Sequence, residues 1–217
     1  MKICETFTSI CGEISVGRFA FFIRLSGCPL NCVWCDTDYA KSGGVEIAEE
    51  ELVEQAVHFP CVVITGGEPF LQKEAVAKFV KKLIKEKPNI RIEIETNGTI
   101  RPVEVGKYKN VVFNVSIKLK NSGNDYKDRI KTSVIDWFIS VDANFKFVVA
   151  SEDDIDEVNM LVKDFGIPKG SVWLMPEGKT KEEQEQKMLP IVERAKMLGY
   201  NFSPRFHVLL WGDKRGV

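Results

Sequence analysis

The sequence predicts an α/β fold, a partial (incomplete) β/α barrel with mostly parallel strands. Apolar, strand-like runs alternate with amphipathic helical segments, which is typical of parallel strands joined by crossover helices. Polar residues also occupy every second position of several runs, as with Arg91, Glu93 and Glu95 in IRIEIE. A filled eight-stranded barrel has bulky apolar residues inside, so this polar face favours a wider, incomplete barrel. An antiparallel sheet with one face in water is the alternative.

The expected strands and helices follow one another along the whole chain. The strands are FAFFIRL (19–25), CVVIT (61–65), IRIEIE (90–95), VVFNVS (111–116), FKFVVA (145–150), SVWLM (171–175) and NFSPRF (201–206). The clearest helix is KEAVAKFVKKLIKEKP (73–88), whose apolar residues recur every three or four positions. Another begins with the capping-box pair Thr180 and Glu183, and we expect Pro190 to kink or split it. The segment 120–129 is the one loop-rich region.

Polar residues recur on one face of the other expected strands too. They are Arg24 in the first strand, Asn114 and Ser116, Asn144 and Lys146, and Arg205 and His207 in the last. If crossover helices cover the apolar face, these side chains line the inside of the barrel, where buried charges need partners. We therefore expect a polar interior that can hold a charged ligand.

Composition limits the classes of partner. With 217 residues, 44% of them hydrophobic, the chain can bury one sizeable core, and we expect a single domain over residues 1–217. Thirty Lys and Arg against 31 Asp and Glu create no strong field for nucleic acid or an anionic membrane. No run reaches the roughly 18 apolar residues of a membrane span. We expect a cytoplasmic protein with a small-molecule substrate and neither nucleic-acid nor membrane partners.

Three of the six cysteines lie within eight residues, in GCPLNCVWCDT (27–37). Without a secretory signal, clustered cysteines favour metal or redox chemistry over disulfides. A structural zinc site or a ferredoxin cluster needs four ligands. Cys28, Cys32 and Cys35 can hold three corners of a cubane cluster and leave one iron open, although a non-catalytic metal knuckle is the alternative. Cys4 and Cys61 are expected to be small buried apolar residues.

This CxxxCxxC spacing, with Trp34 before the last cysteine, resembles the signature of the radical S-adenosylmethionine enzymes. The resemblance implies a radical SAM type of partial barrel and a [4Fe-4S] cluster whose open iron binds S-adenosylmethionine (SAM). It also implies that the reduced cluster cleaves SAM to a 5'-deoxyadenosyl radical. The segment GGEP (66–69) resembles the part of these enzymes that meets the amino group of SAM, which places Gly67 there.

Longer segments resemble one family within this superfamily, the 7-carboxy-7-deazaguanine synthases. They are GEISVGRFAFFIRLSGCPLNCVWCDT, ITGGEP, ETNGT, LMPEG and the closing RFHVLLWGDKRGV. The resemblance implies conversion of 6-carboxy-5,6,7,8-tetrahydropterin to 7-carboxy-7-deazaguanine with loss of ammonia, on the way to modified tRNA bases such as queuosine or archaeosine. It further implies Mg²⁺, a homodimer, and an electron donor such as flavodoxin or ferredoxin.

The resemblance also implies roles for individual residues. Cluster ligands are Cys28, Cys32 and Cys35, and Thr37 is a Mg²⁺ ligand. SAM contacts are Trp34, Cys35, Asp36, Gly67, Ser116, Ile117, Lys118, Met175, Pro176, Glu177 and Gly178. Substrate contacts are Ile10, Cys11, Gly12, Glu13, Arg24, Thr65 and the terminal carboxylate of Val217, and Arg24 and Glu13 are the catalytic candidates.

Simpler roles compete with several of these assignments. Thr37 can be a helix N-cap, Arg24 can pair with Glu93 or Glu95, and Val217 can be a frayed end. The chain also departs from the family, which has Gln where Cys11 stands and Pro where Ile117 stands. Two other functions compete as well: another short radical SAM enzyme such as a glycyl-radical activase, or an iron-sulfur electron carrier.

Overall fold

The structure is a computed structural model that describes residues 1–217, and it contains one nine-stranded sheet in the order β3-β1-β2-β4-β5-β6-β7-β8-β9. The strands are β1 (Lys2–Ile10), β2 (Phe19–Leu25), β3 (Val45–Glu46), β4 (Cys61–Gly66), β5 (Arg91–Thr96), β6 (Val111–Ser116), β7 (Asn144–Val149), β8 (Val172–Pro176) and β9 (Asn201–Phe202). Neighbours from β2 to β9 pair in parallel, whereas β1 is antiparallel to β2 and β3. The edge strands β3 and β9 do not pair, so the barrel is incomplete, as predicted.

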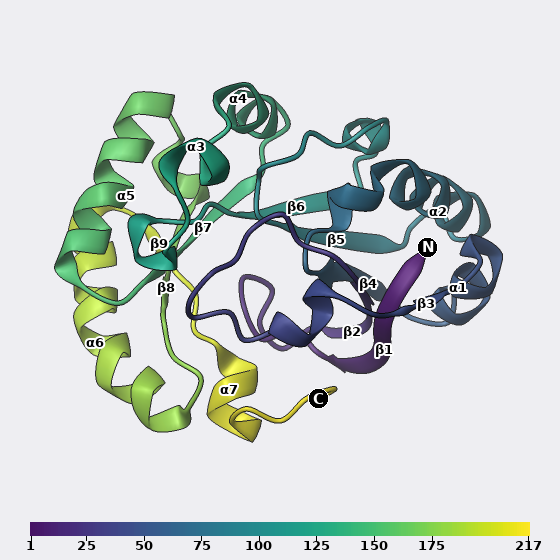
Figure 1. The fold of residues 1–217 in the computed structure, drawn as a ribbon, viewed down its shortest axis with the longest axis horizontal. Coiled ribbons are helices and arrows are strands. Elements are labelled where there is room, and N and C mark those ends of the chain that lie inside the picture. Colours follow the sequence, from purple (N-terminus) through teal and green to yellow (C-terminus); the bar gives the residue numbers. More distant parts are fainter.

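Most helices lie along the outer side of the curved sheet, whereas α7 lies at its open inner side (Figure 1). They are α1 (Glu49–Ala56), α2 (Lys73–Glu86), α3 (Tyr126–Arg129), α4 (Thr132–Ser140), α5 (Glu152–Phe165), α6 (Lys181–Leu198) and α7 (Phe206–Trp211). Short 3-10 turns include η1 (Asp38–Lys41) and η2 (Pro69–Gln72). The main apolar core fills the space between the sheet and these helices, and α2 contributes the residues of its predicted apolar stripe, Val76, Phe79, Val80 and Leu83. None of the helices is long and apolar enough to span a bilayer.

Two elements at the ends of the chain differ from the prediction. β1 was not expected, because polar residues interrupt its apolar ones and its register with β2 shifts between Ile3 and Glu5. The strand expected over 201–206 is wrong beyond Phe202, since Pro204 has no N–H for a ladder hydrogen bond. Arg205 therefore lies in a loop and His207 in α7, not on a strand face.

The helix α6 carries the predicted capping box. The Thr180 side chain accepts from the backbone N–H of Glu183, and the Glu183 carboxylate accepts from that of Thr180. The expected split at Pro190 is wrong, because α6 runs unbroken from Lys181 to Leu198. Pro190 lies on the exposed side of the helix, where water can satisfy the carbonyl that loses its partner.

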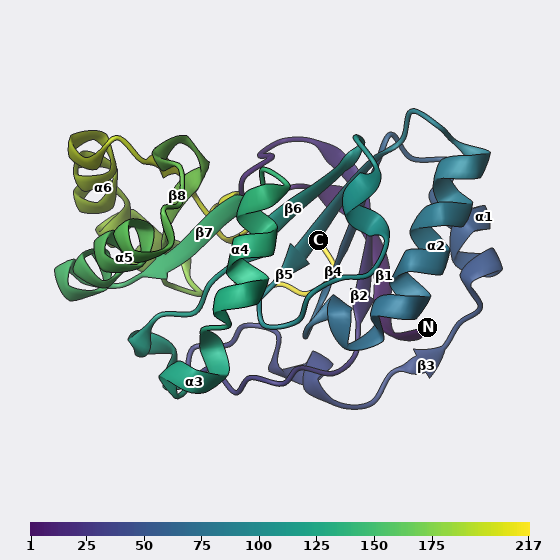
Figure 2. The same ribbon diagram turned by 90° about the horizontal axis from the view of Figure 1, so that it is seen from above.

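The inner side of the sheet holds the cysteine-bearing loop and the C-terminal segment. Seen from above, α1 and α2 cover one end of the sheet and α5 and α6 the other, and the C-terminus lies in front of β4 and β5 (Figure 2). The carboxyl ends of the parallel strands therefore face a space that loops from both ends of the chain enclose.

Candidate active site

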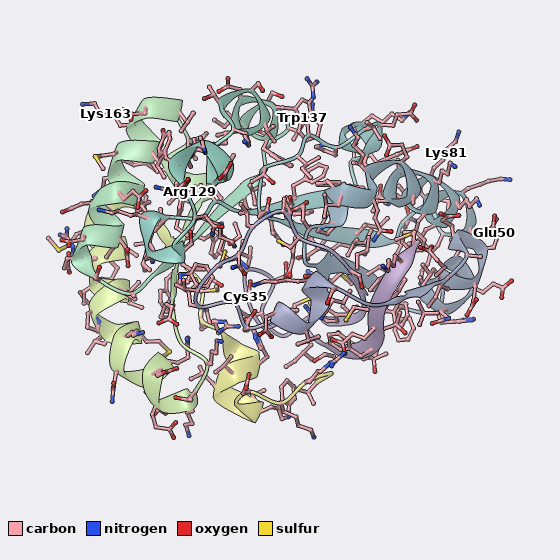
Figure 3. All side chains as sticks on the ribbon, viewed as in Figure 1. Cys35, Glu50, Lys81, Arg129, Trp137 and Lys163 are labelled. Carbon is pink, nitrogen blue, oxygen red and sulfur yellow. The ribbon has the colours of Figure 1, made fainter.

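A cavity of about 230 Å³ lies on the inner side of the sheet. Its walls come from β1, β2, β4 to β8, the cysteine loop, α7 and the last residue. Most of the residues predicted for the site line it: Ile10, Gly12, Glu13, Arg24, Cys28, Cys32, Trp34, Cys35, Asp36, Thr37, Thr65, Gly67, Ser116, Lys118, Met175 and Val217. In Figure 3, Cys35 lies at the centre of the molecule, far from the surface residues Glu50 and Lys81 on the outer helices.

The three clustered cysteines line one end of the cavity. Asn97 lies with its amide nitrogen 3.8 Å from the sulfur of Cys28, and the amide of Asn124 is 3.3 Å from that of Cys32. Burial raises the pKa of Cys28 and of Cys35, which disfavours free thiolates. A bound cation would reverse that preference, since a thiolate is the form that ligates metal.

Close backbone contact fixes the cysteine loop against the GGEP turn. A side chain on Gly67 would place its Cβ 2.0 Å from the carbonyl oxygen of Gly27, so only glycine fits. The N–H of Glu68 donates to the same oxygen at 2.7 Å. The buried Glu68 carboxylate also accepts from the Thr96 hydroxyl and the Asn97 N–H, at 2.8 and 2.7 Å. Glu68 therefore ties the turn after β4 to the end of β5, beside the cysteines.

Lys118 supplies a cation at the same end of the cavity. Its ammonium group donates to the Ser116 hydroxyl at 2.8 Å and lies 5.4 Å from the centre of the Trp34 ring. The Trp34 indole in turn donates to the Asn121 side chain at 3.2 Å. Burial lowers the pKa of Lys118, and the nearby cysteine sulfurs act against that shift. An anionic group bound here would gain a desolvated partner.

An ion-pair network lines another part of the same cavity. Lys146 donates to Glu13, and Arg205 lies 4.0 Å from the same carboxylate. Burial alone would raise the pKa of Glu13, but Lys146 and then Arg205 hold it below its ordinary value. Burial, followed by the charge of Glu13, raises the pKa of Glu95, whose carboxyl accepts from the Thr65 hydroxyl at 2.7 Å. The predicted polar interior is therefore present, and Glu13 and Glu95 both have hydrogen-bond partners there.

Arg24 pairs with neither Glu93 nor Glu95, the two partners that the sequence suggested. Its Nε donates at 2.8 Å to Glu5 on the neighbouring antiparallel strand β1. The sequence did not predict this partner, because it did not predict β1. The terminal guanidinium nitrogens remain for a ligand. The side chain is 16% exposed and lines the cavity, where a carboxylate could meet it.

Thr37 follows the third cysteine and faces the same cavity. Its hydroxyl donates to Asp36 at 2.7 Å and makes no capping bond to η1, although Thr37 holds the N-cap position. Burial would raise the pKa of Asp36, but Arg205 and the Thr37 hydroxyl hold it well below its usual range. The hydroxyl oxygen keeps lone pairs for a hard cation.

Comparison with known proteins agrees with this geometry. Residues 22–188 match the Radical SAM superfamily. The 7-carboxy-7-deazaguanine synthase of Pyrobaculum aerophilum is 36% identical over the whole chain and 97% of its own length. That of Hyperthermus butylicus is 34% identical over 97% of this chain and 92% of its own. The chain belongs to the 7-carboxy-7-deazaguanine synthase family of radical SAM enzymes.

Solved structures support the fold of this synthase family member. QueE from Escherichia coli superposes with a TM-score of 0.72 at 25% identity, covering 95% of this chain and 94% of its own. Streptococcus suis SuiB bound to S-adenosylmethionine has a TM-score of 0.60 at 14% identity, over 84% of this chain and 51% of its own. The second likeness is one of fold alone. Membership of the radical SAM superfamily carries with it a [4Fe-4S] cluster and SAM.

The residues of this synthase family member fit such a cluster. Cys28, Cys32 and Cys35 face one cavity, and asparagine amides approach two of the sulfurs. Such donors stabilise thiolates. Cys28, Cys32 and Cys35 would hold such a cluster by three of its irons, and the buried cation of Lys118 lies near the sulfurs of Cys32 and Cys28.

Five residues predicted for the site do not line the cavity. Cys11 packs with Cys61 and Val63, because alternation along the backbone turns Ile10 and Gly12 toward the cavity and Cys11 away from it. Ile117 is in the core for the same reason, between Ser116 and Lys118. The remaining three are Pro176, Glu177 and Gly178, whose carbonyls or carboxylate bind Gln184, Lys187 and Arg205.

Cys61 is buried, as expected, whereas the prediction for Cys4 is wrong. Cys4 is half-buried, because β1 lies near the sheet edge, and its sulfur is 3.8 Å from a guanidinium nitrogen of Arg215.

Three residues in or beside the cavity were given no individual role from the sequence: His207, Glu68 and Asn97. His207 packs on Gly12, where a Cβ would lie 2.1 Å from the imidazole Nδ1. Glu68 and Asn97 support the cysteine loop. Glu68 belongs to the motif GGEP and Asn97 to the motif ETNGT, so the sequence pointed to both segments. Only the structure shows that the two turns are in contact.

Proposed function

We propose that the chain is the radical SAM lyase that converts 6-carboxy-5,6,7,8-tetrahydropterin to 7-carboxy-7-deazaguanine with loss of ammonia. One observation carries the proposal: the three cysteines and the charged inner face of the sheet line a single cavity. A radical formed beside the cysteines can therefore meet a charged substrate held by the polar side chains of the same cavity. An electron carrier has no use for such a chamber. A glycyl-radical activase is not supported, because the relatives that match the full chain are deazaguanine synthases.

The cysteine end would hold the cofactors. Cys28, Cys32 and Cys35 would ligate the cluster, which supplies the electron that cleaves SAM to the 5'-deoxyadenosyl radical. Gly67, in the turn after β4, lines the cavity and packs against Gly27 of the cysteine loop, where only glycine fits. Lys118 offers the carboxylate of SAM a buried cation. Trp34, Ser116 and Met175 line the same part of the wall.

The charged side chains on the inner face of the sheet would bind the pterin. Arg24 presents its free guanidinium nitrogens to the substrate carboxylate. Glu13, ionised through its pairing with Lys146, is an acceptor for N–H groups of the ring, and His207 faces the same space. Thr65 and Val217 complete the wall. These side chains orient the ring and exclude water, so that the hydrogen to be abstracted lies toward the cysteine end.

The finer assignments rest on the same cavity. Thr37 would ligate Mg²⁺ with one oxygen, and substrate and water oxygens would complete an octahedral set. We also propose a single domain over residues 1–217, a homodimer, and flavodoxin or ferredoxin as the electron donor. The continuous nine-stranded sheet supports the first of these.

A turnover assay tests the proposed function. The assay mixes anaerobically reconstituted protein with a reductant, SAM, Mg²⁺ and the carboxytetrahydropterin. It should yield 7-carboxy-7-deazaguanine, detected by mass spectrometry, and ammonia. Cys32→Ala should abolish turnover, whereas Cys61→Ala should retain it, because Cys61 packs outside the cavity.

Two results would contradict the proposal. Formation of 5'-deoxyadenosine without pterin conversion would indicate a radical SAM enzyme with another substrate. A cluster that accepts electrons but never cleaves SAM would indicate an electron carrier.

A further inference from the structure

The last six residues form a tail that leaves α7 and returns to the catalytic cavity. From α7 the tail runs toward β1 and β2 (Figure 1). Val217 lines the catalytic cavity and also a smaller one of about 100 Å³ between the tail and the segment around Thr37 and Tyr39. Gly212 and Gly216 have φ of 63° and 72°, a backbone region that favours glycine. Val217 is therefore part of the wall of the site.

Arg215 supplies the side-chain hydrogen bonds that join this tail to the rest of the protein. Arg215 donates from Nε to Oε2 of Glu5 at 2.8 Å, and its guanidinium carbon lies 3.8 Å from the centre of the Tyr39 ring. Its Nη2 also lies 3.8 Å from the sulfur of Cys4. None of the other residues from 213 to 217 makes a hydrogen bond to the rest of the chain. Arg215 thus bridges the tail to β1 and to η1.

Glu5 joins this attachment to the substrate-facing arginine. Its Oε1 accepts from Arg24 at 2.8 Å and from the Tyr39 hydroxyl at 3.0 Å, while Oε2 accepts from Arg215. Burial opposes ionisation of Glu5, but its hydrogen bonds to Arg215 and Arg24 hold its pKa below the ordinary value. One mostly buried carboxylate therefore serves two arginines, one in the cavity and one in the tail.

We propose that Arg215 is a positioning residue that clamps the tail on Glu5 and Tyr39 and so holds Val217 at the wall of the catalytic cavity. Two residues span at most about 7 Å, so an anchored Arg215 confines Val217 to a small volume. The position of Val217 would then set the shape of the cavity beside Arg24. The effect on substrate binding rests on the proposed function, whereas the clamp itself does not.

Two measurements on reconstituted protein test the clamp. The first is the rate at which a carboxypeptidase releases Val217 in the absence of substrate, measured by mass spectrometry. Arg215→Ala should speed release about threefold, the scale of a partly exposed ion pair, and Arg215→Lys should do so less because its charge survives. Arg101→Ala is the matched control, because Arg101 also stacks on an aromatic ring, Trp137, at the opposite side of the molecule (Figure 3).

The second measurement is steady-state kinetics. Arg215→Ala should raise the KM for the pterin about threefold and leave the KM for SAM and the thermal midpoint close to wild type. A purely structural role would instead lower the midpoint and raise both KM values together, which overturns the proposal. Unchanged release of Val217 in Arg215→Ala overturns it as well, whatever the substrate proves to be. If wild type fails to convert the pterin, the proposed function fails and the release experiment alone decides the clamp.

Discussion

The Thr37 hydroxyl has two possible roles, a helix N-cap and a metal ligand. Its position before η1 suits a helix cap, but its side chain makes no bond to the helix and donates to Asp36 instead. Asp36 is held by Arg205, so the hydroxyl is fixed in direction at the cavity wall. A small hard cation prefers such oxygens and keeps positions open for substrate atoms.

The first prediction at the residue scale concerns this hydroxyl. Thr37→Ala should weaken the Mg²⁺ dependence of turnover, because one ligand oxygen is lost, and Thr37→Ser should largely retain it. Titration of turnover with Mg²⁺, alongside SAM cleavage, measures both effects. An unaltered titration in Thr37→Ala, with a lowered thermal midpoint, would reject the metal assignment in favour of a structural role.

Contacts between elements place these residues, and α7 is the clearest case. The Phe206 N–H donates to the Gly12 carbonyl at 2.7 Å, and the imidazole of His207 lies against the Gly12 Cα, where no side chain fits. Arg205, just before α7, donates to the Gly178 carbonyl at 2.6 Å. The C-terminal helix is therefore seated on the loop after β1 and on the loop after β8.

The prediction at the element scale is that Gly12→Ala displaces α7. An added Cβ would lie 2.1 Å from the Nδ1 of His207, so the helix or the loop must move, at a cost of about 1 to 3 kcal/mol. The thermal midpoint should fall and the KM for the pterin should rise, whereas SAM cleavage should persist.

Gly170→Ala is the control, because nothing lies within 4 Å of the position of its Cβ. An equal loss of stability in both variants would show that crowding at His207 is not the cause.

At the scale of the whole molecule, the sheet stays open and other parts of the chain close it. β3 and β9 are unpaired with each other, and the cysteine loop, α7 and the tail cover the inner side (Figure 1). Because these segments bury titratable groups, the stability of the fold depends on pH. His207 is held close to Glu13, Arg205 and Asp36, and burial lowers its pKa below the ordinary value of 6.5.

The stability of the whole protein should therefore depend on His207 below neutral pH. The unfolded chain binds a proton at His207 near pH 6.5, whereas the folded chain does so only at lower pH, so the unfolded state gains protons first. The contribution of His207 is complete above pH 6.5 and is lost as the pH falls, by no more than about 1.4 kcal/mol per pH unit.

Chemical denaturation of wild type and His207→Gln between pH 8 and 5 measures this contribution. The free energy of unfolding of wild type should fall relative to that of the variant below pH 6.5. Comparing the two proteins cancels the buried carboxyls, such as Glu68 and Glu95, whose raised pKa values act in the opposite direction. Parallel curves would mean that His207 does not contribute.

Local patterns determined much of this protein. The alternation of strands and helices, the apolar stripe of α2, the capping box of α6 and the polar face of the sheet all follow from spacing along the chain. The spacing of Cys28, Cys32 and Cys35 likewise indicated the chemistry of one end of the cavity. These features depend on neighbours within a few residues, so the sequence displays them directly.

Other features required the tertiary structure because their partners lie far apart in the chain. The pairing of Glu5 with both Arg24 and Arg215 depends on the antiparallel seating of β1, which weak alternation and a register shift concealed. The place of His207 depends on Pro204 ending β9 early and on Gly12 leaving room for the imidazole. Spacing predicts which face a residue takes, whereas packing between distant segments decides what it meets there.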